Sequence, residues 1–217
     1  MHYNLSDVDS IANQFLLSMR DKTVQTDRAG FRRNVERLGA IMAYEISKKL
    51  HYRKATVETP LAPATANIPS DNPVLITILR AGLPFFNGFQ EFFPSADCGF
   101  IGAYRQEGVG HITIKLDYAA TPNLEGRHVI LIDPMLATGR SLIDALKTLS
   151  KNGKPAHLHI ACVIASPEGL QYVESNLKPM NVPFTIWSVD VDERLDERFY
   201  IVPGLGDAGD LSFGNKI

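Results

Sequence analysis

The sequence has little of what marks secreted, membrane-bound or nucleic-acid-binding proteins. Its two cysteines, Cys98 and Cys162, lie in strand-like apolar runs, so we expect buried free thiols rather than a disulfide or a metal site. The formal net charge of −2 offers no basic surplus for nucleic acid or a membrane surface. No apolar run approaches the length of a membrane span, and residues 1–7 lack the basic and apolar pattern of a leader. We therefore expect a cytoplasmic protein with small-molecule partners and no nucleic acid or membrane partner.

Residue patterns of several catalytic classes are also missing. The six histidines form no metal-ligand spacing, and His157 and His159 share one face of a predicted strand, which favours a structural role. No Ser-His-Asp, Cys-His or paired-carboxylate spacing supports a catalytic unit. The charged residues between Asp190 and Arg198 are typical of a solvated face.

What is present suits one α/β domain: 45% of the 217 residues are apolar and 21% are charged. Alternating strands and helices predict a mainly parallel sheet. The expected strands cover about 74–79, 98–104, 112–117, 128–133, 157–165 and 184–190, and the expected helices about 27–50, 82–92, 140–151 and 167–177. The proline-rich segment from Val57 to Pro73 predicts an extended arm or a loop with strand fragments. Within the domain we distinguish N-terminal helices and arm (1–72), a core (73–190) and a C-terminal hood (191–217).

Residues 129–141 carry the strongest chemical signal. Val129–Ile132 reads as a strand buried on both faces of a parallel sheet, and Pro134 ends its ladder. Thr138, Gly139 and Ser141 then lead into an amphipathic helix, whose unpaired N–H groups and positive dipole end suit a phosphate. Asp133, at the strand's end, is placed to accept hydrogen bonds from ribose hydroxyls.

Three other segments carry weaker signals. Arg80, before Ala81 and Gly82, could grip a polyanion, although a surface arginine is the default interpretation. Arg105 precedes the glycines of Gln106–Gly110, which suggest a mobile loop, and by itself it reads as a solvated arginine. Pro203–Asp210 has the composition of a tight loop with exposed backbone groups, or of a tail turn; EF-hand ligand spacing is absent.

Taken together, these segments resemble the uracil phosphoribosyltransferase family, a branch of the type I phosphoribosyltransferases. The likeness rests on Asp133-Pro134-Met135-Leu136-Ala137-Thr138-Gly139, on Ile78–Pro84, and on Tyr200–Asp210 with Phe213-Gly214. Weaker likeness covers 26–44 and 165–169. Two departures stand out. Arg140 replaces a glycine in the family's Thr-Gly-Gly-Ser, and residues 108–122 keep only the pair Lys115-Leu116.

The resemblance implies a type I phosphoribosyltransferase fold and the reaction of uracil with 5-phosphoribosyl diphosphate (PRPP) to give UMP and diphosphate. It implies Mg²⁺ bound with PRPP at Asp207, and a homodimer or higher homo-oligomer. The implied catalytic residues are Arg80, Arg105 and Asp207. The implied PRPP-binding residues are Arg80, Arg105, Asp133, Pro134, Met135, Leu136, Ala137, Thr138, Gly139, Arg140, Ser141 and Asp207. The implied uracil-binding residues are Tyr200, Ile201, Gly206, Asp207 and Ala208. A phosphoribosyltransferase for another base and an RNA-binding regulator of pyrimidine genes with the same fold remain alternatives.

Overall fold

An eight-stranded sheet forms the centre of the molecule. The computed structural model describes residues 1–108 and 111–215, and within them the side chains of all residues except 103–117. The strands of the sheet are β1 (His2–Asn4), β4 (Val74–Leu79), β5 (Asp97–Gly108), β6 (His111–Ala120), β7 (His128–Ile132), β8 (Met135–Leu136), β9 (His157–Ala165) and β10 (Phe184–Val191). Their order is β1-β10-β9-β7-β4-β5-β6, with β8 also pairing β9, and all pairs are parallel except β5 with β6. The predicted mainly parallel sheet is confirmed.

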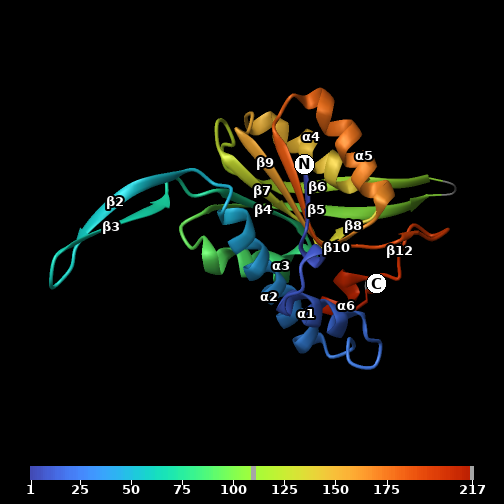
Figure 1. Ribbon diagram of the computed structural model, residues 1–217. Helices are drawn as coiled ribbons and strands as arrows, with labels where there is room; N and C mark the ends of the chain where they lie inside the picture. Colours follow the sequence, from blue (N-terminus) through green and yellow to red (C-terminus); the bar gives the residue numbers. More distant parts are fainter. Residues whose placement is uncertain (109–110, 216–217) are drawn as a thin grey trace.

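Helices cover both faces of this sheet (Figure 1). The helices are α1 (Ile11–Arg20), α2 (Arg28–Ser47), α3 (Gly82–Phe92), α4 (Arg140–Leu149), α5 (Pro167–Leu177) and α6 (Ala208–Phe213). Successive residues of β7 pack on opposite sides, as the pleat requires. Val129 and Leu131 belong to the core with α4 and α5, whereas Ile130 and Ile132 belong to the core with α1, α2 and α3. All four are fully buried, as expected for a central parallel strand.

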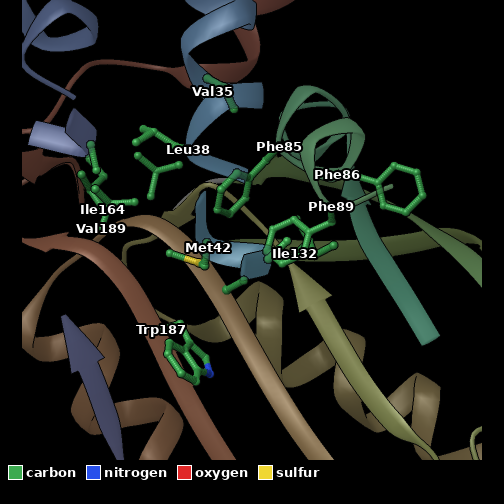
Figure 2. Close-up of a cluster of buried hydrophobic side chains, with 14 of the residues drawn as sticks. Val35, Leu38, Met42, Phe85, Phe86, Phe89, Ile132, Ile164, Trp187 and Val189 are labelled. Atoms are coloured by element: carbon green, nitrogen blue, oxygen red, sulfur yellow. The ribbon is translucent and has the colours of Figure 1, made fainter. Parts of the chain in front are cut away.

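Apolar residues spaced three or four apart along α2, a pattern that predicts one buried helical face, form much of the larger core (Figure 2). Asp27 caps α2 by accepting the Ala29 N–H at 3.1 Å, and the stripe Phe31, Val35, Leu38, Met42 and Ile46 is buried. The helices α2 and α3 approach closely, since a Cβ on Gly39 would lie 2.2 Å from the Phe85 carbonyl oxygen. The helix α3 closely follows β4, so its packing on α2 holds the end of β4 in place.

A two-stranded arm projects from the body of the molecule (Figure 1). Its strands, β2 (Tyr52–Glu58) and β3 (Pro63–Pro69), are antiparallel, and almost every residue in them is exposed. Of the two predictions for the proline-rich segment 57–73, an extended arm or a loop with strand fragments, the arm is the one found, and it begins earlier, at Tyr52. An isolated hairpin is only marginally stable in water, and this arm has no core of its own.

Several details differ from the sequence-based expectations. Cys162 is buried but Cys98 is only half-buried, at the start of β5; both thiols are free. The strand expected to end near residue 104 continues to Gly108, because it pairs with β6 as a long hairpin. Residues 109–110 of the expected mobile loop lie outside the described part of the chain. The elements α1, α6 and β1 have no counterpart among the predicted ones. No helix in the described residues combines the length and apolarity needed to cross a membrane.

Candidate active site

A cleft opens at the carboxyl edge of the parallel strands, where an open α/β sheet usually binds its ligands. Its volume is about 190 Å³. Three segments distant in sequence form its walls: the end of β4 with Arg80, the turn that follows β7, and the C-terminal stretch from Phe199. Among the residues predicted from sequence, the cleft is lined by Arg80, Asp133, Met135, Leu136, Ala137, Thr138, Gly139, Ser141, Tyr200, Ile201, Gly206, Asp207 and Ala208.

The turn after β7 leads directly into the first turn of α4. Gly139 is the N-cap residue and has a left-handed backbone, with φ of 72°. A Cβ there would also lie 2.7 Å from Cγ2 of Val173 in α5, so both the conformation and the packing require glycine. The Ser166 hydroxyl donates to the Ala137 carbonyl at 2.7 Å and steadies the turn from behind. This geometry places the N-terminus of α4 at the cleft, as anion sites require.

Arg80 links the end of β4 to the C-terminal helix. Its guanidinium donates to Asp210 Oδ1 at 3.0 Å and to the Gly214 carbonyl at 3.4 Å. Its Nε is buried and has no hydrogen-bond partner. The side chain keeps 39% of its surface exposed, so it can still meet an anion in the cleft. The guanidinium is thus held at the site by the segment that forms the opposite wall.

The C-terminal wall combines a short hairpin with α6. The strands β11 (Arg194–Leu195) and β12 (Ile201–Val202) pair antiparallel, and the chain then passes through Gly204 and Gly206, both with positive φ. Asp207 caps α6, because its Oδ1 accepts the Asp210 N–H at 2.9 Å. Ala208 and Ile201 are largely buried. This wall therefore brings the carboxylate of Asp207 and a glycine-containing backbone to the cleft, together with Phe199 and Tyr200.

Two predicted site residues, Pro134 and Arg140, do not line the cleft. Pro134 is buried behind the cleft, where its carbonyl accepts the N–H groups of Val163 and Ile164 at 3.0 and 3.1 Å. Arg140 is exposed as the first residue of α4 and is not among the lining residues. Arg105 lies in β5 opposite Ile114, and its side chain is outside the described residues.

The sequence predicts a solvated face for the charged run from Asp190 to Arg198. At Asp192 this prediction is wrong, because that residue is only 4% exposed. Arg20 of α1 reaches across and holds Asp192 with two hydrogen bonds of 2.6 and 2.8 Å. Sequence reasoning also missed Asp210 as the partner of Arg80, and Phe199 as a lining residue. Only the acidic character of the run signalled Asp192, and no local pattern signalled Arg20.

A helix N-terminus open to a cleft, an acid beside it and an arginine at the same sheet edge are the parts of an enzyme site for a phosphorylated sugar. The family model for uracil phosphoribosyltransferase matches residues 9–215. The chain belongs to this family, and it is a pentosyl-transferring enzyme.

Relatives and a solved structure agree over nearly the whole chain. A protein of Porphyromonas gingivalis named uracil phosphoribosyltransferase is 47% identical over 209 residues, which is 96% of this chain and 95% of that protein. A protein of the same name from Methanothermobacter thermautotrophicus is 40% identical and covers 87% of this chain and 85% of its own. A solved structure from Aquifex aeolicus superposes with a TM-score of 0.87 at 31% identity, with 100% of both chains covered.

Proposed function

We propose that uracil and PRPP react in this cleft to give UMP and diphosphate. The observation that carries the proposal is that one cleft is lined both by the turn that opens α4 and by the glycine-containing C-terminal segment. The first suits a sugar phosphate, and the second suits a planar base with hydrogen-bonding edges. The names of the relatives favour uracil over another base and over an RNA-binding regulator.

The ribose 5-phosphate half of PRPP would lie along the turn after β7. The backbone from Ala137 to Ser141, with the hydroxyls of Thr138 and Ser141, would hold the 5-phosphate. Asp133, whose Oδ1 accepts the Met135 N–H at 3.3 Å, lines the cleft beside this turn and would accept hydrogen bonds from the ribose hydroxyls. These contacts fix the position of C1, the atom that changes its bond.

The diphosphate would leave beside Arg80. Attack by uracil N1 on C1 as the C1–O bond breaks implies an oxocarbenium-like transition state, so alignment and stabilisation of the departing negative charge are the protein's main tasks. Arg80 has five N–H donors and makes three hydrogen bonds to Asp210 and Gly214, while its Nε–H has no partner. We assign a second contact to Arg105, at the family's Tyr-Arg position, and Asp207 to the PRPP side of the C-terminal wall.

Uracil would be read by backbone groups near Ile201 and from Gly206 to Ala208, beside Tyr200. Uracil offers two carbonyl acceptors and one N3–H donor, and backbone N–H and C=O groups match this pattern. Cytosine lacks the N3–H and would leave a buried carbonyl without a donor, so the pocket can reject it by a large factor.

The carboxylates of the cleft fit Mg²⁺ brought in by PRPP. Mg²⁺ prefers a few carboxylate and phosphate oxygens and keeps several waters. Asp133 and Asp207 both line the cleft. Among the described side chains, those of residues 1–102 and 118–215, no group of three acidic, histidine or cysteine residues could hold a metal alone. Bound there, Mg²⁺ would neutralise charge on the diphosphate.

We further propose that the chain acts as a cytoplasmic homo-oligomer. The exposed β2–β3 arm supports this proposal, since a hairpin without its own core gains stability by packing on another subunit. A copy of the same chain is the partner that is always available to it.

Formation of radiolabelled UMP from uracil tests the proposed reaction. Purified protein should make UMP only when PRPP and Mg²⁺ are both present, and EDTA should abolish the product. Cytosine, adenine and hypoxanthine with PRPP serve as controls for the base. Folded protein that makes no UMP, or that prefers another base, would contradict the proposal.

A further inference from the structure

A buried ion pair outside the cleft clamps the backbone that leads into the base-binding segment. The side chains of Arg20 and Asp192 are only 16% and 3% exposed. They meet in a fork, with both terminal nitrogens of Arg20 donating to the two oxygens of Asp192 at 2.6 and 2.8 Å. One of these nitrogens also donates to Asp190 at 2.9 Å. A paired and buried guanidinium of this kind has a rigid orientation.

Both polar backbone groups of Gly204 are held by this pair. The Gly204 N–H donates to Asp192 Oδ2 at 2.8 Å, and its carbonyl accepts from Arg20 at 3.0 Å. The residue must be glycine, because φ is +64° and a Cβ would lie 2.1 Å from the Ile201 carbonyl oxygen. The next residue is held as well: the Leu205 side chain is buried, and its carbonyl accepts from the Gln25 amide at 3.3 Å. Gly206, Asp207 and Ala208 follow at once and line the cleft.

We propose that Arg20 and Asp192 are positioning residues for uracil: they fix the backbone of Gly204 and Leu205, and thereby the groups of residues 206–208 that bind the base. The inference rests on the proposed function, which places uracil at residues 206–208. Neither side chain lines the cleft. We therefore expect them to affect the affinity for uracil, because backbone groups that are free to shift bind the base less well. The affinity for PRPP should change little, since the phosphate-binding turn after β7 is built from other segments.

Asp192 is itself held in place by the central sheet, so the ion pair has a fixed position. It directly follows β10, and its N–H donates to the carbonyl of Ala165 at the end of β9 at 2.9 Å. Arg20 is the last residue of α1, which packs on α2. The clamp thus ties the base end of the cleft to the central sheet and to the N-terminal helices.

Arg20→Lys tests the inference, because lysine keeps the charge but cannot present a fork to Asp192 and also reach Gly204. We expect the KM for uracil to rise about tenfold, the KM for PRPP to stay within about twofold, and kcat at saturating uracil to stay within about threefold. Gln25→Ala removes the bond to the Leu205 carbonyl, together with a bond of 2.9 Å to the Met19 carbonyl, and we expect a smaller rise in the KM for uracil, about threefold. It also keeps the inference testable if Arg20→Lys does not fold.

Arg127→Lys is the matched control. Arg127 also joins a carboxylate to a backbone carbonyl, with bonds of 2.9 Å to Asp97 and 3.3 Å to Asn72, but it lies away from the cleft. Both KM values should match the wild type. A lower melting temperature and lower kcat in Arg20→Lys with an unchanged KM for uracil would overturn the inference and leave a structural role. Equal rises in both KM values would also overturn it. Wild-type protein that forms no UMP would instead overturn the proposed function, and this inference with it.

Discussion

At the scale of single residues, Asp207 has two tasks that one substitution can separate. One oxygen of its carboxylate caps α6, and we assign the charge to PRPP and its metal ion. Asparagine is an equally good N-cap residue, whereas alanine is not. Comparing Asp207→Asn with Asp207→Ala therefore separates the effect on stability from the effect on the reaction.

We expect Asp207→Asn to lower kcat/KM for PRPP by at least about 100-fold, or about 2.7 kcal/mol, with a melting temperature close to that of the wild type. Asp207→Ala should lose the same activity and in addition about 1 kcal/mol of stability through the missing cap. Steady-state kinetics and thermal unfolding measure the two effects. Near-normal kinetics in Asp207→Asn would remove this residue from the site.

Arg140, the departure from the family motif, lies at the edge of the phosphate site. It is exposed, and only its N–H is tied to the turn, by a 3.4 Å bond to the Thr138 hydroxyl. We expect Arg140→Gly to raise the KM for PRPP by no more than about tenfold, or about 1.4 kcal/mol, with kcat nearly unchanged, since an exposed charge contributes about 1 kcal/mol or less. A collapse of kcat would show that Arg140 acts in the transition state.

At the scale of elements, the parallel strands and the β2–β3 arm have different roles. The parallel strands bring the ends of β4 and β7 to one edge, so residues far apart in sequence share a cleft. The arm contributes nothing to the cleft, and the residues of β3 are all exposed. Its removal should therefore affect association before it affects the fold of the subunit.

Replacing residues 53–68 with Asn-Gly tests the role of the arm. Tyr52 and Pro69 are paired at its base, so a two-residue turn can join them. We expect the circular dichroism spectrum to keep its helical signal, and the mass in solution, measured by light scattering, to fall from that of an oligomer to that of a monomer. An unchanged oligomer would show that the subunits meet elsewhere.

At the scale of the whole molecule, folding gathers four histidines at the other end of the sheet from the cleft. His51 lies just beyond α2, His128 begins β7, and His157 and His159 lie on β9. Neighbouring rings lie between 4.5 and 5.8 Å apart. Trp187 donates its indole N–H to Nδ1 of His159 at 3.3 Å, so that nitrogen must carry a lone pair.

This arrangement makes stability depend on pH. Burial, followed by the charges of His157 and His128, lowers the pKa of His159 to about 3 from the ordinary 6.5. The pKa values of His157 and His128 are also lowered, mainly by burial. The unfolded chain takes up a proton near pH 6.5 and the folded protein does not. The stabilisation from His159 is therefore complete above pH 6.5 and is lost progressively as the pH falls toward 3.

We expect the free energy of unfolding to fall between pH 6.5 and 5 with a contribution from His159 of about 1.4 kcal/mol per pH unit. Denaturant unfolding at several pH values measures this slope above the range in which ordinary carboxylates titrate. His159→Gln is the control, since its amide can still accept from Trp187, and its slope should be smaller by that amount. Equal slopes in the two proteins would contradict this account.

The sequence by itself determined the features that depend on neighbouring residues. Residues 129–141 specify a buried strand, an acid and a helix-opening turn, because a phosphate-binding turn is built from contiguous backbone N–H groups. The stripe of α2 and the alternation of strands and helices are likewise local patterns, and they predicted the core and the parallel sheet. Most of the site residues that the family resemblance implied line one cleft.

Only the tertiary structure decided which distant polar groups meet. Asp192 reads as one more acid of a solvated run until Arg20, 172 positions away, pairs with it. The bond between Arg80 and Asp210 spans 130 positions, and the four histidines come from three separate segments. Such pairings have no local pattern, because the sequence does not show whether a charged side chain will be solvated by water or paired with a buried partner. The free energies of those two environments differ only once the chain has folded.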